Sequence, residues 1–110
     1  MKEDTIKKII GFRDNRDWKQ YHNPKDLAIS LSLEASELLE NFQWLSTEES
    51  LSKHLVNIKE ELADVLIYSV LFAEAIGVDI DEVILNKIDI NGQKYPVEKA
   101  FGKKEKYTEL

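Results

Sequence analysis

Apolar residues recur three and four positions apart along most of the chain, which is the spacing of one face of an α-helix. The first such face consists of Ile6, Ile9 and Ile10. It predicts a helix over residues 4–16, followed by a polar loop over residues 17–23. No segment alternates apolar and polar residues as a half-buried strand does. The pattern therefore predicts an all-α fold.

Capping residues predict where the other helices begin. Asn, Ser and Asp side chains accept hydrogen bonds from the free N–H groups of a first helical turn, and Pro needs no such partner there. The predicted starts are Asn23-Pro24, the capping box Ser46-Thr47-Glu48-Glu49, and Asp79-Ile80-Asp81-Glu82. The corresponding ends are expected near residue 42, at Gly77, and either near Asn91-Gly92 or just before Pro96. The tail over residues 96–110 is polar and rich in lysine, and we expect it to be irregular.

These elements predict one domain over residues 1–110, with four helices around one core. The chain has 110 residues, which suits a single domain, and no linker or repeat divides it. It contains no cysteine, which excludes a disulfide framework and a zinc–thiolate site. The net charge of −6 argues against nucleic acid as a partner, although a divalent cation can bring a small anion to an acidic site.

The apolar runs are too short to span a membrane. The longest lies over residues 65–76, and the amino terminus has no apolar stretch typical of a signal peptide. We therefore expect a soluble, cytoplasmic protein.

Two pairs of acids with the same spacing lie beside apolar helix faces. Glu34 and Glu37 are three residues apart in the second predicted helix, and Glu61 and Asp64 repeat this spacing in the third. On a helix of about 100° per residue, Glu34 and Glu61 each lie within about 60° of an apolar stripe. The two stripes consist of Leu27, Leu31 and Leu38, and of Ile58, Val65 and Phe72. Facing acid pairs would repel each other unless a proton or a cation intervened, and an all-oxygen ligand set suits Mg²⁺ or Mn²⁺.

Other interpretations of the charged residues exist. A single Glu-x-x-Glu is typical of a solvated helix face, and the spacing alone leaves this alternative open. A di-iron carboxylate site requires the motif Glu-x-x-His on two helices, and neither His22 nor His54 lies three residues after a Glu. The Gly-x-x-x-x-Gly-Lys phosphate loop is absent.

The acid pairs also carry a family resemblance. Glu34-Ala35-Ser36-Glu37 followed by Glu61-Leu62-Ala63-Asp64 resembles the signature of the MazG-like all-α NTP pyrophosphatases. Seven further segments resemble the dCTP pyrophosphatase branch, so that the resemblance covers nearly the whole chain. These segments are Phe12-Arg13-Asp14, Arg16-Asp17-Trp18, Tyr21-His22-Asn23-Pro24, Phe42-Gln43-Trp44, Asp64-Val65-Leu66-Ile67-Tyr68, Lys87-Ile88-Asp89-Ile90-Asn91 and Tyr95-Pro96, together with the ending Lys106-Tyr107-Thr108-Glu109-Leu110.

The resemblance implies a four-helix MazG-like bundle that is oligomeric, and a hydrolase that cleaves nucleoside triphosphates to monophosphate and pyrophosphate as part of nucleotide house-cleaning. It implies a homodimer or homotetramer with pockets at the subunit interfaces. The implied Mg²⁺ ligands and catalytic residues are Glu34, Glu37, Glu61 and Asp64. The implied base and sugar pocket consists of residues 18–22, with Trp18 and His22, together with Trp44 and Tyr68. The segment that meets the phosphates contains Lys87, Asn91, Lys94 and Tyr95.

Several points stay open at this stage. Glu37 is our choice of general base, and Glu40 is the alternative. The connection over residues 45–59 is shorter than in the animal dCTP enzymes, and Ile9 stands where we expect His in them. The substrate is therefore expected to be dCTP or another pyrimidine nucleotide such as dUTP. A non-catalytic binding module is a further alternative. Lys87, Asn91 and Lys94 share one helix face, which without the resemblance is typical of a solvated basic face.

One feature supports an oligomer independently of the family. Ile29 and Leu33 lie far from the main apolar stripe of their helix. A helix that is apolar around most of its circumference needs cover on more than one side.

Overall fold

The computed structural model describes all residues from 1 to 110, and it divides into two compact units over residues 1–78 and 79–110. The first unit contains α1 (Glu3–Asn15), the short 3₁₀ helix η1 (Lys19–Tyr21), α2 (Pro24–Glu40) and α3 (Thr47–Ile76). The second contains α4 (Ile80–Lys94), α5 (Val97–Ala100) and the 3₁₀ helix η2 (Tyr107–Glu109). There is no strand, which confirms the all-α prediction.

Local capping explains where the helices of the first unit begin and end. The Asn23 side chain accepts a hydrogen bond from the backbone N–H of Asp26 at 2.9 Å, and Pro24 follows it at the first helical position. Ser46 and Glu49 form the complete capping box that opens α3. Gly77 ends α3 with φ of 74°, a left-handed conformation that glycine adopts without a steric penalty. These predicted boundaries are confirmed.

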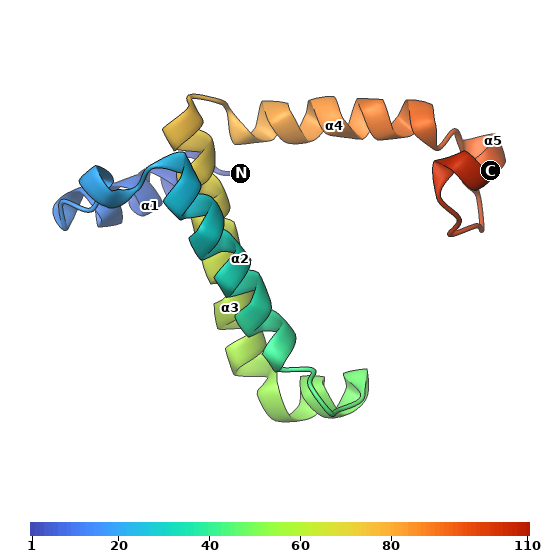
Figure 1. Cartoon of the computed structure of the whole chain (residues 1–110), viewed down its shortest axis with the longest axis horizontal. Helices are drawn as coiled ribbons and strands as arrows, with labels where there is room; N and C mark the ends of the chain where they lie inside the picture. Colours follow the sequence, from blue (N-terminus) through green and yellow to red (C-terminus); the bar gives the residue numbers. More distant parts are fainter. The chain divides into compact units, whose positions relative to one another are not determined.

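α2 and α3 lie side by side as an antiparallel pair, and α1 packs on α3 (Figure 1). The buried apolar core comes from α2 and α3 and consists of Leu27, Val70, Leu71 and Ala73. α3 has one irregularity, because His54 has non-helical angles (φ −124°, ψ 18°) and kinks the helix. The part of α3 after this kink carries Glu61 and Asp64.

The second unit begins with a cap of the same kind as α2. The Asp79 side chain accepts a hydrogen bond from the backbone N–H of Glu82 at 2.9 Å. α4 ends at Lys94, just before Pro96, so the later of the two predicted ends is correct. No residue of α4 is buried within the chain.

The expectation of an irregular tail over residues 96–110 is wrong in part. Pro96 stops α4 but starts α5, because its carbonyl accepts hydrogen bonds from the N–H groups of Lys99 and Ala100 at 2.9 Å each. η2 brings Tyr107 against Tyr95, with the two rings edge to face and their centres 5.9 Å apart. Neither contact leaves a periodic apolar pattern along the chain, so neither could be predicted from the sequence.

No helix in either unit combines the length and the apolar character needed to cross a membrane.

Candidate metal centre

Polar residues follow the line along which α2 and α3 face each other. The amide of Asn57 donates a hydrogen bond to the side-chain oxygen of Asn41 at 2.8 Å. One turn further along both helices, Glu37 and Glu61 lie close enough for Glu37 to raise the pKa of Glu61. Because α2 and α3 are antiparallel, a step of three or four residues back along α2 and forward along α3 leads to the next pair of facing residues.

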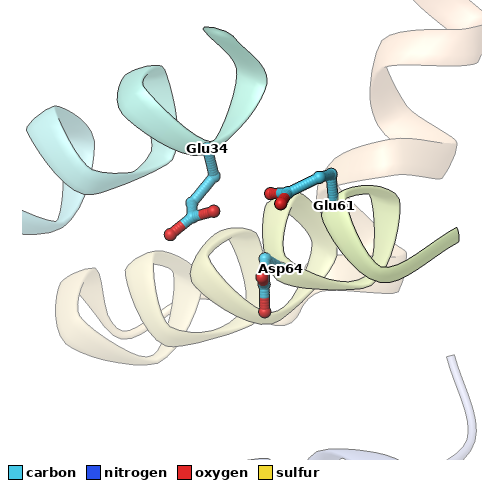
Figure 2. Close-up of side chains that lie close together, drawn as sticks. All are labelled: Glu34, Glu61 and Asp64. Carbon is cyan, nitrogen blue, oxygen red and sulfur yellow. The ribbon is translucent and has the colours of Figure 1, made fainter. Parts of the chain in front are cut away.

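Glu34, Glu61 and Asp64 converge at the end of this line. Each offers one carboxylate oxygen, and the three oxygens lie within 4.8 Å of one another. All three residues are half-buried. Figure 2 shows Glu34 on α2 and Glu61 on α3 turned toward each other, with Asp64 beside them. Glu37 is exposed and lies outside this trio of oxygens, at its margin.

The surroundings of Glu34 and Glu61 disfavour the charged forms of these two carboxyl groups. Burial, the hydrogen bond and charge of Glu37 and the charge of Asp64 together raise the pKa of Glu34 to about 7. Burial also raises the pKa of Glu61, again with a contribution from Glu37. No lysine or arginine forms a salt bridge with these acids. The chain therefore gathers negative charge here without supplying the positive charge that would balance it.

Two oxygens of the cluster lack any partner. Oε2 of Glu34 and Oε2 of Glu61 are buried and form no hydrogen bond. A buried carboxylate oxygen without a partner is costly, and a hard divalent cation with oxygen ligands removes that cost. The donor set and its unpaired atoms therefore fit Mg²⁺ or Mn²⁺.

A largely apolar cavity of about 570 Å³ adjoins the cluster between α1 and α3. Its lining includes Ile9, Phe12, Trp18, His22, Asp64 and Tyr68. The Trp18 ring stands edge to face against Phe12 at 5.9 Å and lies 6.4 Å from the His22 ring, measured between ring centres. Because Asp64 belongs to both the cluster and the lining, the cavity opens beside the convergent carboxylates.

Five of the expected substrate-binding residues are not part of the lining of this cavity. Trp44 is 91% exposed and adopts φ of 65°, which is unusual for a residue with a bulky side chain. The other four belong to α4 or its cap in the second unit, and all are exposed: Lys87, Asn91, Lys94 and Tyr95. The ammonium of Lys94 lies 5.0 Å from the centre of the Tyr107 ring. Within the first unit, the cavity brings together Trp18, His22 and Tyr68, and its lining does not include Trp44.

Arg13 lines the same cavity and was not singled out from the sequence. It is only 3% exposed. The signal was present, because Arg13 continues the face that begins with Ile6, Ile9 and Ile10. An arginine on an apolar face usually lies at its solvated margin, and its acidic partner is 61 positions away at Glu74.

Known proteins resemble the chain in sequence and in fold. The family model described as MazG-like family matches residues 29–110. The chain is 40% identical to dCTP pyrophosphatase 1 of Mus musculus and 39% identical to that of Homo sapiens, each over 98% of the chain. It spans 66% of the length of both relatives. It is also 40% identical to a pyrophosphatase from Archaeoglobus fulgidus of known crystal structure, with a TM-score of 0.80 over 86% of this chain and 91% of that one.

Proposed function

Since the chain belongs to the MazG-like family, we propose that it hydrolyses a nucleoside triphosphate to the monophosphate and pyrophosphate. The observation that carries this proposal is the convergence of Glu34, Glu61 and Asp64 beside an aromatic cavity, with two carboxylate oxygens left unpaired. The relatives named dCTP pyrophosphatase favour dCTP or a related pyrimidine nucleotide as the substrate.

The residues that would hold a divalent cation are Glu34, Glu61 and Asp64, with Glu37 as a fourth ligand from the margin. When bound, Mg²⁺ supplies the neutralising charge for the phosphates and lowers the pKa of a bound water. The carboxylates would hold the cation at a fixed place, because they lie on α2 and α3 and the register of these two helices is set by neighbouring contacts. No rearrangement is needed to assemble them.

Glu37 remains our choice for the proton acceptor. Its exposed carboxyl reaches the edge of the cluster, where a water aimed at the α-phosphorus has access from solvent. The alternative, Glu40, is exposed on the next turn and takes no part in the pKa shifts of the cluster. This difference supports Glu37.

Trp18, His22 and Tyr68 are proposed to bind the base and sugar. Stacking of a base on an aromatic side chain contributes about 1–3 kcal/mol and tolerates different bases. Burial and the nearby charge of Arg13 lower the pKa of His22, so that its imidazole is neutral near pH 7. Its buried Nδ1 has no partner in the chain and is therefore available to a polar atom of the ligand.

A second copy of the chain is proposed to complete the site. Large apolar side chains are exposed on α2 and α4, among them Leu33 at 59% and Ile88 at 58%. Such surfaces favour association, and a homodimer or homotetramer would cover them. In that assembly we expect Trp44, the α4 residues Lys87, Asn91 and Lys94, and the C-cap residue Tyr95 to lie near the base and phosphates.

The test is pyrophosphate release from a panel of nucleoside triphosphates, measured with Mg²⁺ and again with EDTA. We expect release that depends on the metal and is fastest with dCTP. Fastest release from dUTP would change the substrate and leave the reaction intact. Absence of metal-dependent release from every nucleotide would exclude the enzymatic function and favour a non-catalytic nucleotide-binding module.

A further inference from the structure

Arg13 is the one buried cation of the first unit, and its charge is fully compensated. Nη1 donates a hydrogen bond to Oε2 of Glu74 on α3 at 2.5 Å. Nε and Nη2 lie 2.9 and 2.8 Å from Oδ1 of Asp14, the next residue of α1. Burial alone would lower the pKa of Arg13, but these two acids raise it, and the guanidinium stays charged. One of its two partners lies on its own helix and the other on the neighbouring helix.

The main chain of Arg13 holds the segment that forms one wall of the cavity. Its carbonyl accepts hydrogen bonds from the N–H groups of Arg16 at 3.2 Å and of Trp18 at 3.1 Å. Between these residues, Asp17 has φ of 55°, and the chain turns there toward η1 and His22. Arg13 therefore fixes the start of the Trp18–His22 segment with its backbone while its side chain reaches α3.

The remaining walls of the cavity belong to other parts of α1 and to α3, which carries Asp64 and Tyr68. The distance between Trp18 and Tyr68 depends on how α1 docks on α3. The Arg13–Glu74 ion pair is the only salt bridge observed between these two helices. The Arg13 side chain is 4% exposed, and the Glu74 side chain is 32% exposed. A bridge with a buried guanidinium is restricted to a narrow geometry.

We propose that Arg13 is a positioning residue for the nucleotide, because its bond to Glu74 sets the Trp18–His22 wall at a fixed distance from Tyr68 on α3. The proposal rests on the proposed function, since it assumes that this cavity takes the base and sugar. It assigns Arg13 no contact with the reacting atoms. The metal ligands come from α2 and α3, so the bridge bears on nucleotide affinity and not on metal affinity.

The chain supplies a matched pair of variants for the test. Glu74→Gln removes the charge that ties Arg13 to α3, and Asp14→Asn removes the charge of its partner within α1. Both variants leave the buried guanidinium with one acid, and both partners are partly exposed, so folding is expected to survive. If Arg13 only needs charge balance, the two variants behave alike. If it ties α1 to α3, only Glu74→Gln affects the cavity.

With the nucleotide that gives the fastest pyrophosphate release, we expect Glu74→Gln to raise KM on the order of tenfold, with kcat and the Mg²⁺ dependence nearly unchanged. Asp14→Asn is expected to keep the wild-type KM. Equal KM values in the two variants, or a loss confined to kcat, would overturn the proposal.

Trp18 fluorescence gives a readout that does not depend on turnover. In a Trp44→Phe background Trp18 is the single tryptophan, because the chain has two. We expect Glu74→Gln to shift the Trp18 emission of the nucleotide-free protein to longer wavelength, as its wall loosens and admits water, and Asp14→Asn to leave it in place. An unshifted emission in Glu74→Gln overturns the positioning role. If the wild-type chain releases no pyrophosphate, the proposed function fails. The comparison of Trp18 emission in the two variants then decides by itself whether Arg13 fixes the position of the Trp18–His22 wall.

Discussion

Two clusters of charge lie on α3 and differ in how their charge is balanced. Around Arg13, one buried guanidinium meets the carboxylates of Asp14 and Glu74. Around Glu61, three carboxylates meet with no cation. The first cluster is complete within the chain, whereas the second leaves two buried oxygens without partners. A complete cluster can serve the fold by itself, whereas an incomplete one is stabilised by a proton or by a bound cation.

The pKa shifts express the same contrast. The acids around Arg13 raise its pKa and so favour its charged form. Burial and the neighbouring acids raise the pKa of Glu34 to about 7, which favours its neutral form. The carboxylate cluster therefore keeps its charge only at the expense of stability, and a bound cation would reverse that relation.

The largest effect is expected from Glu61→Gln, which removes one proposed metal ligand from the incomplete cluster. We expect pyrophosphate release to fall about a hundredfold or more, because the lost carboxylate acts on the charged transition state. Helix content and thermal stability should persist or rise, since the change removes repulsion. Pyrophosphate release and circular dichroism measure the two effects.

Glu60→Gln is the matched control for that variant. Glu60 is the exposed neighbour of Glu61 and lies outside the cluster. It should keep the wild-type rate. A wild-type rate in Glu61→Gln, or an equal loss in both variants, would remove Glu61 from the metal site.

The next largest effect is expected in the pH dependence of the stability of the metal-free protein. The pKa of Glu34 rises from 4.5 to about 7 on folding, so the folded chain holds a proton that the unfolded chain releases. This contribution to stability is complete below pH 4.5 and is lost as the pH rises through about 7. We expect the melting temperature of the metal-free protein to fall over this interval, and to fall less in Glu34→Gln.

Mg²⁺ should act in the opposite direction. The cation binds the deprotonated acids, so its stabilising effect should be larger at pH 8 than at pH 5. At a concentration of about one hundred times its dissociation constant, a ligand that binds only the folded state adds about 2.7 kcal/mol. Thermal melts with Mg²⁺ or EDTA at both pH values test this. Equal stabilisation at pH 5 and pH 8 would contradict it.

The helices could be predicted from the sequence because their signals are local. Asn23, Ser46, Gly77 and Asp79 each cap a helix end through contacts within a few residues. The convergence of Glu34 and Glu61 could be anticipated only as a hypothesis, because a helical wheel shows the face of a residue but not what that face meets.

The features that were missed depend on distant parts of the chain or on solvent. The burial of Arg13 follows from its pairing with Glu74, far along the sequence, and no local pattern specifies that partner. The kink at His54 interrupts a helix whose residues otherwise favour it. Trp44 was expected in one pocket with Trp18 but is 91% exposed, and no local pattern distinguishes an exposed tryptophan from one that lines a pocket.

The smallest effect is expected at a third polar contact, the neutral pair of Asn41 and Asn57, which lies one turn from Glu37 and Glu61. Asn41 is 6% exposed, and its Nδ2 donates hydrogen bonds to the carbonyls of Glu37 and Leu38 at 3.3 Å each. Asn57→Ala leaves the buried Oδ1 of Asn41 unpaired, which should cost about 1–2 kcal/mol of unfolding free energy. Asn41→Leu should cost less, because the exposed amide of Asn57 can turn to water.

The double variant Asn41→Leu/Asn57→Ala tests whether losing the whole hydrogen bond costs less stability than leaving one buried partner unpaired. Replacing both partners by apolar groups removes the unpaired atom, so the double variant should be more stable than Asn57→Ala alone in urea unfolding. Simple addition of the two single losses would contradict this expectation. Apolar substitutions in the carboxylate cluster would have a second consequence. They would also remove the unpaired buried atoms, but they would eliminate the proposed metal ligands. Gain in stability with loss of metal binding is the behaviour that distinguishes a site from a structural contact.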